Sequence, residues 1–170
     1  GVSLVDINAD GHLDIYVSNS GDIKGDNKQN ELFINNGDLT FTEKAYEYGL
    51  DDRGYSTHAA FFDFDKDGDL DCYLLNNSYK GGFRITSIGR DQRPIRDEVG
   101  GDKFFLNDNG KFVDISEEAG IYGSIIGFGL GVTVGDANND GWMDIYVSND
   151  FFERDYLYIN NQDGTFSESL

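Results

Sequence analysis

The chain has 170 residues with 32 acidic and 13 basic side chains, and its formal net charge of −19 argues against nucleic acid or an anionic membrane surface as a partner. Thirteen Phe and ten Tyr, set among alternating polar residues, argue against a disordered chain. The single cysteine excludes an internal disulfide framework, and no apolar run is long enough for a transmembrane segment.

The chain opens on a strand-like segment, residues 1–5, and we therefore expect it to be a piece of a longer protein. An acidic stretch follows at 6–14 with the pattern Asp-x-Asn-x-Asp-Gly-x-x-Asp. It leads into an alternating strand at 13–19. A third strand is predicted at 32–35 and, after an Asn-Gly turn, a fourth is centred on Phe41.

The same order of elements recurs twice more. The acidic pattern returns at 63–71 and at 136–144, and the second copy has Asp in place of Asn at its third position. Residues 44–50 and 115–121 both end in Gly plus an aliphatic residue, and each is expected to form one helical turn. The remaining strands are expected at 57–62, 70–76, 104–107 and around Phe112 in the second unit, and at 130–135, 143–149, 157–160 and around Phe166 in the third.

The acidic pattern predicts calcium-binding loops, which we call the first (6–14), second (63–71) and third (136–144) loop. Calcium takes about six to eight oxygen ligands, and oxygen side chains at alternate positions, with Gly at the sharp turn, let one short loop wrap one ion. Three copies predict three calcium ions. An EF-hand is excluded because it needs an acid at loop position twelve and a following helix, whereas Val17, Leu74 and Val147 occupy that position in strands.

Each unit reads as strand, calcium loop, strand, connection, strand, turn, strand, which is a four-stranded antiparallel meander. Such a sheet cannot bury both faces alone, so neighbouring units must stack. The predicted fold class is all-β, with three β-propeller blades at 1–50, 51–121 and 122–170, the second with an insertion at 77–101. Three blades cannot close a ring, so we expect the remaining blades of a longer protein, or partner chains, to complete it.

The repeat resembles a known family. The loop pattern between the first two strands resembles the FG-GAP/VCBS repeats of integrin-α-like β-propellers. The stretches 127–136, 144–149 and 158–166 are similar to secreted bacterial VCBS-repeat proteins related to cartilage acidic protein. The resemblance covers the chain except the insertion at 77–101. It implies fold and calcium, whereas the ligand stays open because this propeller serves receptors, lectins and enzymes alike.

The resemblance also implies the ligands of each ion. Side-chain ligands are expected from Asp6, Asn8, Asp10 and Asp14, from Asp63, Asp65, Asp67 and Asp71, and from Asp136, Asn138, Asp140 and Asp144. Backbone carbonyls of His12, Asp69 and Trp142 are expected to complete the sites. We expect calcium to be structural because the loop side chains are all ligands, and the second loop to bind tightest because it has four ligand carboxylates. We expect the affinity of these loops for calcium to be weak. Weak calcium sites suit an extracellular or cell-surface setting, and the bacterial outer surface is favoured.

The connections between second and third strands are expected at the end of the sheets opposite to the calcium loops. The middle connection is basic, and its candidates for binding an anionic glycan or a carboxylate are Arg84, Arg90, Arg93 and Arg96. The alternative is that these arginines pair with nearby acids such as Asp91, Asp97 and Glu98, or dock onto a neighbouring domain.

The sequence shows no catalytic constellation, and we expect no enzyme. His12 lies within a calcium loop, and His58 is expected to pack or hydrogen-bond inside a strand. Trp142 is either an exposed sugar-stacking residue or a packing residue between blades. The preferred function is a binding or adhesion module for an extracellular protein or glycan. The alternative is the propeller part of an extracellular carbohydrate-processing enzyme or a lectin.

Overall fold

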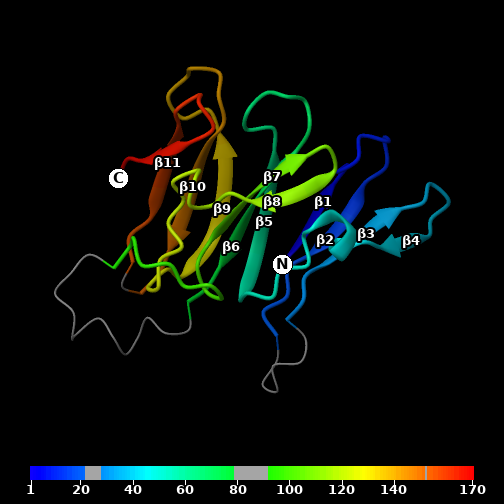
Figure 1. The fold of residues 1–170 in the computed structure, drawn as a ribbon, viewed down its shortest axis with the longest axis horizontal. Coiled ribbons are helices and arrows are strands. Elements are labelled where there is room, and N and C mark those ends of the chain that lie inside the picture. The colour runs from blue at the N-terminus through cyan, green and yellow to red at the C-terminus, as the bar shows by residue number, and fades with distance from the viewer. Residues whose placement is uncertain (22–27, 79–91, 152) are drawn as a thin grey trace.

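Three separate antiparallel sheets form the architecture of this chain (Figure 1). The computed structural model describes residues 1–21, 28–78, 92–151 and 153–170. Each sheet has four strands in simple meander order: β1-β2-β3-β4 in sheet 1, β5-β6-β7-β8 in sheet 2 and β9-β10-β11-β12 in sheet 3. The prediction of an all-β fold built from four-stranded antiparallel sheets is therefore confirmed.

The strands begin and end close to the expected positions. In sheet 1 they are β1 (Val2–Val5), β2 (Asp14–Val17), β3 (Glu31–Asn35) and β4 (Phe41–Glu43). In sheet 2 they are β5 (Ser56–Phe62), β6 (Asp71–Asn76), β7 (Lys103–Asp108) and β8 (Lys111–Asp114). In sheet 3 they are β9 (Gly129–Gly135), β10 (Asp144–Asn149), β11 (Tyr156–Asn160) and β12 (Phe166–Glu168).

The predicted helical turns follow the fourth strands of sheets 1 and 2. The first is the helix α1 (Ala45–Tyr48), which ends at Gly49 in a left-handed conformation. The second is a single turn closed by the Ala119 N–H, which donates to the Ile115 carbonyl at 2.7 Å. Among the described residues, no helix has the length and apolar character needed to cross a membrane.

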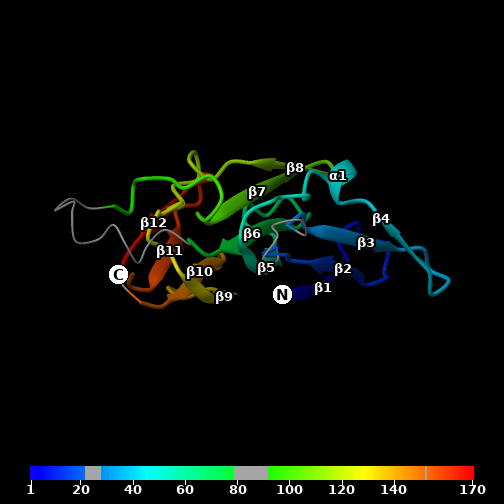
Figure 2. The ribbon, with the colours of Figure 1, turned by 90° about the horizontal axis from the view of Figure 1, so that it is seen from below.

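The sheets stack in chain order, with sheet 2 in the middle. Their first strands, β1, β5 and β9, lie next to one another along one side of the molecule (Figure 2). One apolar core lies between sheets 1 and 2 and contains Tyr16 and Cys72. A second lies between sheets 2 and 3 and contains Tyr73 and Tyr158. Because both of its faces are covered, β6 is buried at every residue.

The outer faces of sheets 1 and 3 lack such a cover. Tyr16 and Tyr73, at matching positions of β2 and β6, are fully buried under the following sheet, whereas Tyr146 of β10 is 41% exposed. Phe41, Phe112 and Phe166 lie at or near the start of the fourth strands. Phe112 and Phe166 are buried against the preceding sheet, whereas Phe41 is 42% exposed. The two end sheets therefore expose the positions that form interfaces elsewhere in the chain.

Candidate metal centres

The three acidic loops join the first and second strands of their sheets and gather at one end of the molecule, the top of Figure 1. Their backbones turn in the same way. Gly11, Gly68 and Gly141 all have positive φ, between 87° and 97°, which only glycine adopts without strain. The fourth residues, Ala9, Lys66 and Asn139, are also left-handed, with φ of 56°, 65° and 62°. The spacing of the pattern is thus matched by one repeated loop geometry.

The last aspartate of each loop is a buried structural clamp. Asp71 accepts the Phe64 N–H from its own loop at 3.1 Å and the Asn107 N–H from the third strand at 2.9 Å. Asp14 and Asp144 repeat this arrangement with the backbone N–H groups of Ile7 and Asn35, and of Ala137 and Asn160. A carboxylate has about four lone-pair sites, so the clamp leaves capacity for a cation. The sequence pattern predicted these residues as ligands only.

The second loop gathers its carboxylates into one cluster. Among the described residues, Asp63, Asp65 and Asp71 are the only three His, Cys, Asp or Glu side chains whose ligand atoms all lie within 4.8 Å of one another. In the same part of the chain, Oδ1 of Asp63 is buried and has no hydrogen-bond partner. An unpaired buried carboxylate oxygen is costly, and a cation would remove that cost.

The first and third loops are closed on themselves instead. The Asp6 carboxylate accepts the N–H groups of Asp10 and Gly11 at 3.0 and 2.9 Å. Asp136 accepts those of Asp140 and Gly141 at 3.0 and 2.8 Å in the same way. These bonds use the oxygens that were expected to bind calcium, so these two loops show the ligand residues side by side without the convergence of the second loop.

The electrostatics of the loops differ accordingly. Burial raises the pKa of Asp71 to about 7, and the pKa values of Asp65 and Asp69 are also raised by burial, with the neighbouring loop carboxylates adding to the effect. In the other loops the backbone N–H groups of His12 and Trp142 hold the pKa values of Asp10 and Asp140 below their usual range. Crowded carboxylates of the second loop therefore gain most from a divalent cation.

Hard oxygen ligands arranged in this way suit calcium. The residues that would hold an ion in the second loop are Asp63, Asp65 and Asp71, with Asp67 beside them in the loop. Bound there, a divalent cation would neutralise part of the carboxylate repulsion and tie the loop to the clamp on Asp71.

The opposite end of each sheet carries a second repeated clamp that the sequence analysis missed. The residue before the third strand bonds a tyrosine of the second strand: Asn30 donates to the Tyr16 hydroxyl at 2.9 Å, and the Tyr73 hydroxyl donates to Asp102 at 2.7 Å. Tyr146 donates to Asp155 in the third unit. The signal was present, because an Asn or Asp stands at this position in each repeat.

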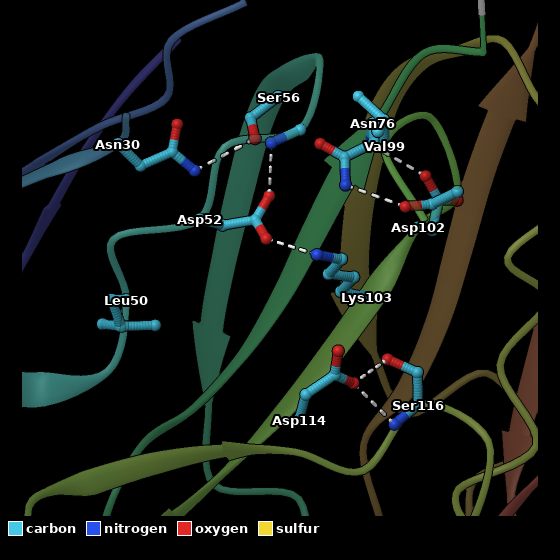
Figure 3. A network of polar contacts seen from close by, with 12 residues as sticks. Asn30, Leu50, Asp52, Ser56, Asn76, Val99, Asp102, Lys103, Asp114 and Ser116 are labelled. Carbon is cyan, nitrogen blue, oxygen red and sulfur yellow. Dashed lines mark hydrogen bonds and ion pairs between the residues drawn. The ribbon is translucent and has the colours of Figure 1, made fainter. Parts of the chain in front are cut away.

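An asparagine at the end of the second strand completes this clamp (Figure 3). The backbone N–H of Asn76 donates to Asp102 at 2.8 Å, and its side chain donates to the Gly101 carbonyl at 2.8 Å. Asn19 and Asn149 make the matching bonds in the other two units. The same network includes a partly buried ion pair between Lys103 of β7 and Asp52, which lies in the connection that leads into β5.

The repeated loops and clamps agree with the comparison to known proteins. The sequence matches the profile of the FG-GAP-like repeat over residues 6–74 and 95–147, which is more than half of the chain. The chain belongs to the FG-GAP-like repeat family.

The comparisons with individual proteins add less. No curated protein matches this FG-GAP-like chain. Among solved structures, it is similar to an Agrocybe aegerita lectin described for specific recognition of non-reducing terminal N-acetylglucosamine, with a TM-score of 0.46 and 21% sequence identity. The match covers 98% of this chain and 37% of the lectin chain, so the chain spans little more than a third of that protein.

Two of the four candidate ligand arginines have structural contacts in the FG-GAP-like chain. Arg96 donates to the carbonyls of Asp102 and Ile121 at 3.1 and 2.8 Å. Arg93 bonds the buried carboxylate of Glu153 through Nε and Nη2, at 2.9 and 2.8 Å. The other two candidates, Arg84 and Arg90, lie outside the described residues. Arg96 also pairs with an acid, because its Nε lies 3.5 Å from Oε1 of Glu117, so the alternative that these side chains pair with acids describes both arginines.

Trp142 and His58 are both partly buried. The Nζ of Lys66 in the second loop lies 4.2 Å from the centre of the Trp142 ring in the third loop. Trp142 thus contacts the neighbouring blade-like unit, as one of its two expected roles requires. His58 lies in β5.

Replacing Asp144 with Asn is expected to destabilise the chain by about 1–2 kcal/mol even in the presence of a calcium chelator. An amide offers one acceptor oxygen where Asp144 offers two, so the N–H of Asn160 or of Ala137 loses its acceptor. Urea unfolding in EGTA measures the effect. Glu118→Gln removes one charge at an exposed site and is the control, and equal stability of the two variants would contradict the clamp.

Proposed function

We propose that the chain is a calcium-binding segment of an FG-GAP-type β-propeller in an extracellular or cell-surface protein. The observation that carries the proposal is the convergence of Asp63, Asp65 and Asp71, together with the unpaired buried oxygen of Asp63. The proposal extends to three ions because the backbone turns of all three loops match. The closer resemblance to secreted bacterial VCBS-repeat proteins is part of the proposal.

Calcium would act as a structural ion. At about 1 mM calcium and a Kd of about 0.1 mM, each site adds about 1.4 kcal/mol to the free energy of unfolding. Sites of that affinity would fill in extracellular calcium and stand empty in a cytosol, so the proposed affinity and the proposed extracellular setting belong together.

Further blades complete the proposed propeller. The exposed Tyr146 marks the face where a following blade would pack, and the exposed Phe41 marks the face for a preceding blade. Both assignments are supported by Tyr73 and Phe112, which occupy the matching positions of sheet 2 and are buried at the interfaces between sheets. Such a scaffold serves as a binding or adhesion module for protein or glycan ligands, which is the role we propose for the longer protein.

The test of the calcium proposal uses a substitution that makes the second loop like the other two. Asp65→Asn replaces the loop sequence Asp-x-Asp-x-Asp by the Asp-x-Asn-x-Asp of the first and third loops. The measurement is a calorimetric calcium titration. In the wild type we expect the second loop to be the tightest site, and we expect Asp65→Asn to weaken that site about tenfold because it removes one ligand charge.

The fluorescence of the single tryptophan, Trp142, gives a second readout, located at the third loop. Because Lys66 of the second loop lies over its ring, the first ion should change the fluorescence slightly, and the larger change should follow when the third loop, with three ligand carboxylates, binds its ion. The matched variant Asn138→Asp should shift the fluorescence response to lower calcium. A fluorescence change that is complete with the first binding event would contradict the ranking, and the absence of any calcium-dependent heat or melting shift would overturn the proposal.

A further inference from the structure

The junctions between neighbouring loops are built differently, although the loops share one backbone geometry. Between the second and third loops, the fourth residue of one loop, Lys66, extends over the seventh residue of the next, Trp142, with Nζ 4.2 Å from the ring centre. This junction is filled by an ammonium group on an aliphatic stem.

The matching junction between the first and second loops is hollow. Its fourth residue is Ala9 and its seventh is Asp69, and both line a hollow of about 280 Å³. Ile7, Leu70 and Tyr48 supply apolar walls. Because ligand pockets for whole small molecules begin near ~300 Å³, this hollow suits a single side chain better than an oligosaccharide.

A carboxylate also borders the hollow. Asp69 lines it, and within the described part of the chain its Oδ1 is buried and has no hydrogen-bond partner. The second loop, from Asp63 to Asp71, has five aspartates and one lysine, Lys66, so the loop stays anionic after one calcium ion has bound. A positively charged group in the hollow would meet this charge in partly buried surroundings, where ion pairing is stronger than at an open surface.

We propose that the hollow between the first and second loops binds a lysine side chain of a partner protein. The aliphatic stem would lie along the apolar walls and the ammonium group would pair with Asp69, in the place that Lys66 takes at the next junction. This site deepens the proposed binding function, and it gives the calcium end of the sheets a recognition role of its own, which the sequence analysis had assigned to the opposite end.

The chain offers its own competitor for this site. Ala9 has φ of 56°, close to the 65° of Lys66. The backbone at residue 9 therefore has the conformation that holds a lysine at the next junction, and Ala9→Lys should be accommodated there. The substituted side chain should fill the hollow from within. The matched control is Asn139→Lys, which adds the same charge at the same position of the third loop, where no further loop of this chain follows.

The experiment is an NMR titration of ¹⁵N-labelled protein in millimolar calcium with Nα-acetyl-lysine amide. We expect saturable shifts at the amides of Ala9, Gly68, Asp69 and Leu70 in the wild type and in Asn139→Lys. In Ala9→Lys we expect binding at least tenfold weaker. The comparison ligand is Nα-acetyl-norleucine amide, which has the aliphatic stem without the ammonium group and should produce no saturable shifts.

Two results would overturn the inference: equal shifts with the norleucine amide, or equal affinity for the lysine amide in Ala9→Lys and wild type. Calcium titrations of the same samples separate this inference from the proposed function. A chain that binds calcium and ignores the lysine amide loses the lysine site alone, whereas a chain that binds no calcium loses the proposed function.

Discussion

Replacing Phe104 with Ala is expected to lower the free energy of unfolding by about 3–5 kcal/mol, the largest effect of any single substitution considered for this chain. Phe104 is fully buried on β7 between sheets 2 and 3. Its ring lies edge-on to Phe64 and Phe166, with centroids 4.9 and 5.4 Å apart, and near Phe62 at 6.0 Å. Truncation removes these contacts and leaves a cavity that stacked sheets cannot easily collapse.

The matched control is Leu157→Ala. Leu157 occupies the same repeat position in β11, but it lies beside Tyr146 on the uncovered face of sheet 3. Its truncation should cost no more than about 1 kcal/mol, because water already reaches that face. Urea unfolding measures both variants. Similar losses for Phe104→Ala and Leu157→Ala would contradict the packing of sheet 2 against sheet 3.

The strand order and the sheet topology follow from the sequence because each loop and turn carries its own local signal. The Asp-Gly pairs fix the loops, Asn-Gly or Asp-Gly fix the turns, and alternation fixes which side of each strand is apolar. Tyr16, Tyr73 and Tyr146 lie at matching positions of the three second strands. Their different exposure was not predicted, since it depends on whether another sheet covers that face and not on the strand itself.

The hydrogen bonds inside the three acidic loops could not be predicted from the repeated sequence pattern. The shared spacing predicted the same ligand positions in all three loops, with one more carboxylate in the second. In the structure Asp6 and Asp136 accept backbone N–H groups, whereas Oδ1 of Asp63 is buried without a hydrogen-bond partner. The second loop also has Asp65 where the other loops have an amide. Asn8 and Asn138 donate to Asp10 and Asp140 within their loops, a bond that the Asp65 carboxylate cannot donate when ionised. Which loop oxygens accept backbone N–H groups depends on local geometry, and the spacing of the aspartates in the sequence does not show it.

The clamp at the end of the sheets opposite to the acidic loops leads to a second large effect, a dependence of the free energy of unfolding on pH. Asp102 is buried, and burial raises its pKa from an ordinary value of 3.8 to about 7, although hydrogen bonds from Asn76 and Tyr73 act in the opposite direction. Between these two pH values the folded chain holds a proton on Asp102 that the unfolded chain has released. Stability contributed by this proton is complete below pH 4 and is lost as the pH rises through 7.

The matched variant is Asp102→Asn, because Asn30 occupies this position in the first unit and bonds Tyr16 as a neutral group. Between pH 5 and pH 8, wild type should lose about 2–3 kcal/mol relative to Asp102→Asn. The difference between the two proteins is the quantity to measure, by urea unfolding at each pH, since the raised pKa of Asp71 affects both proteins equally. A difference that stays constant over this range would show that Asp102 is ionised throughout, with its charge held by the nearby Arg96 and the two hydrogen bonds.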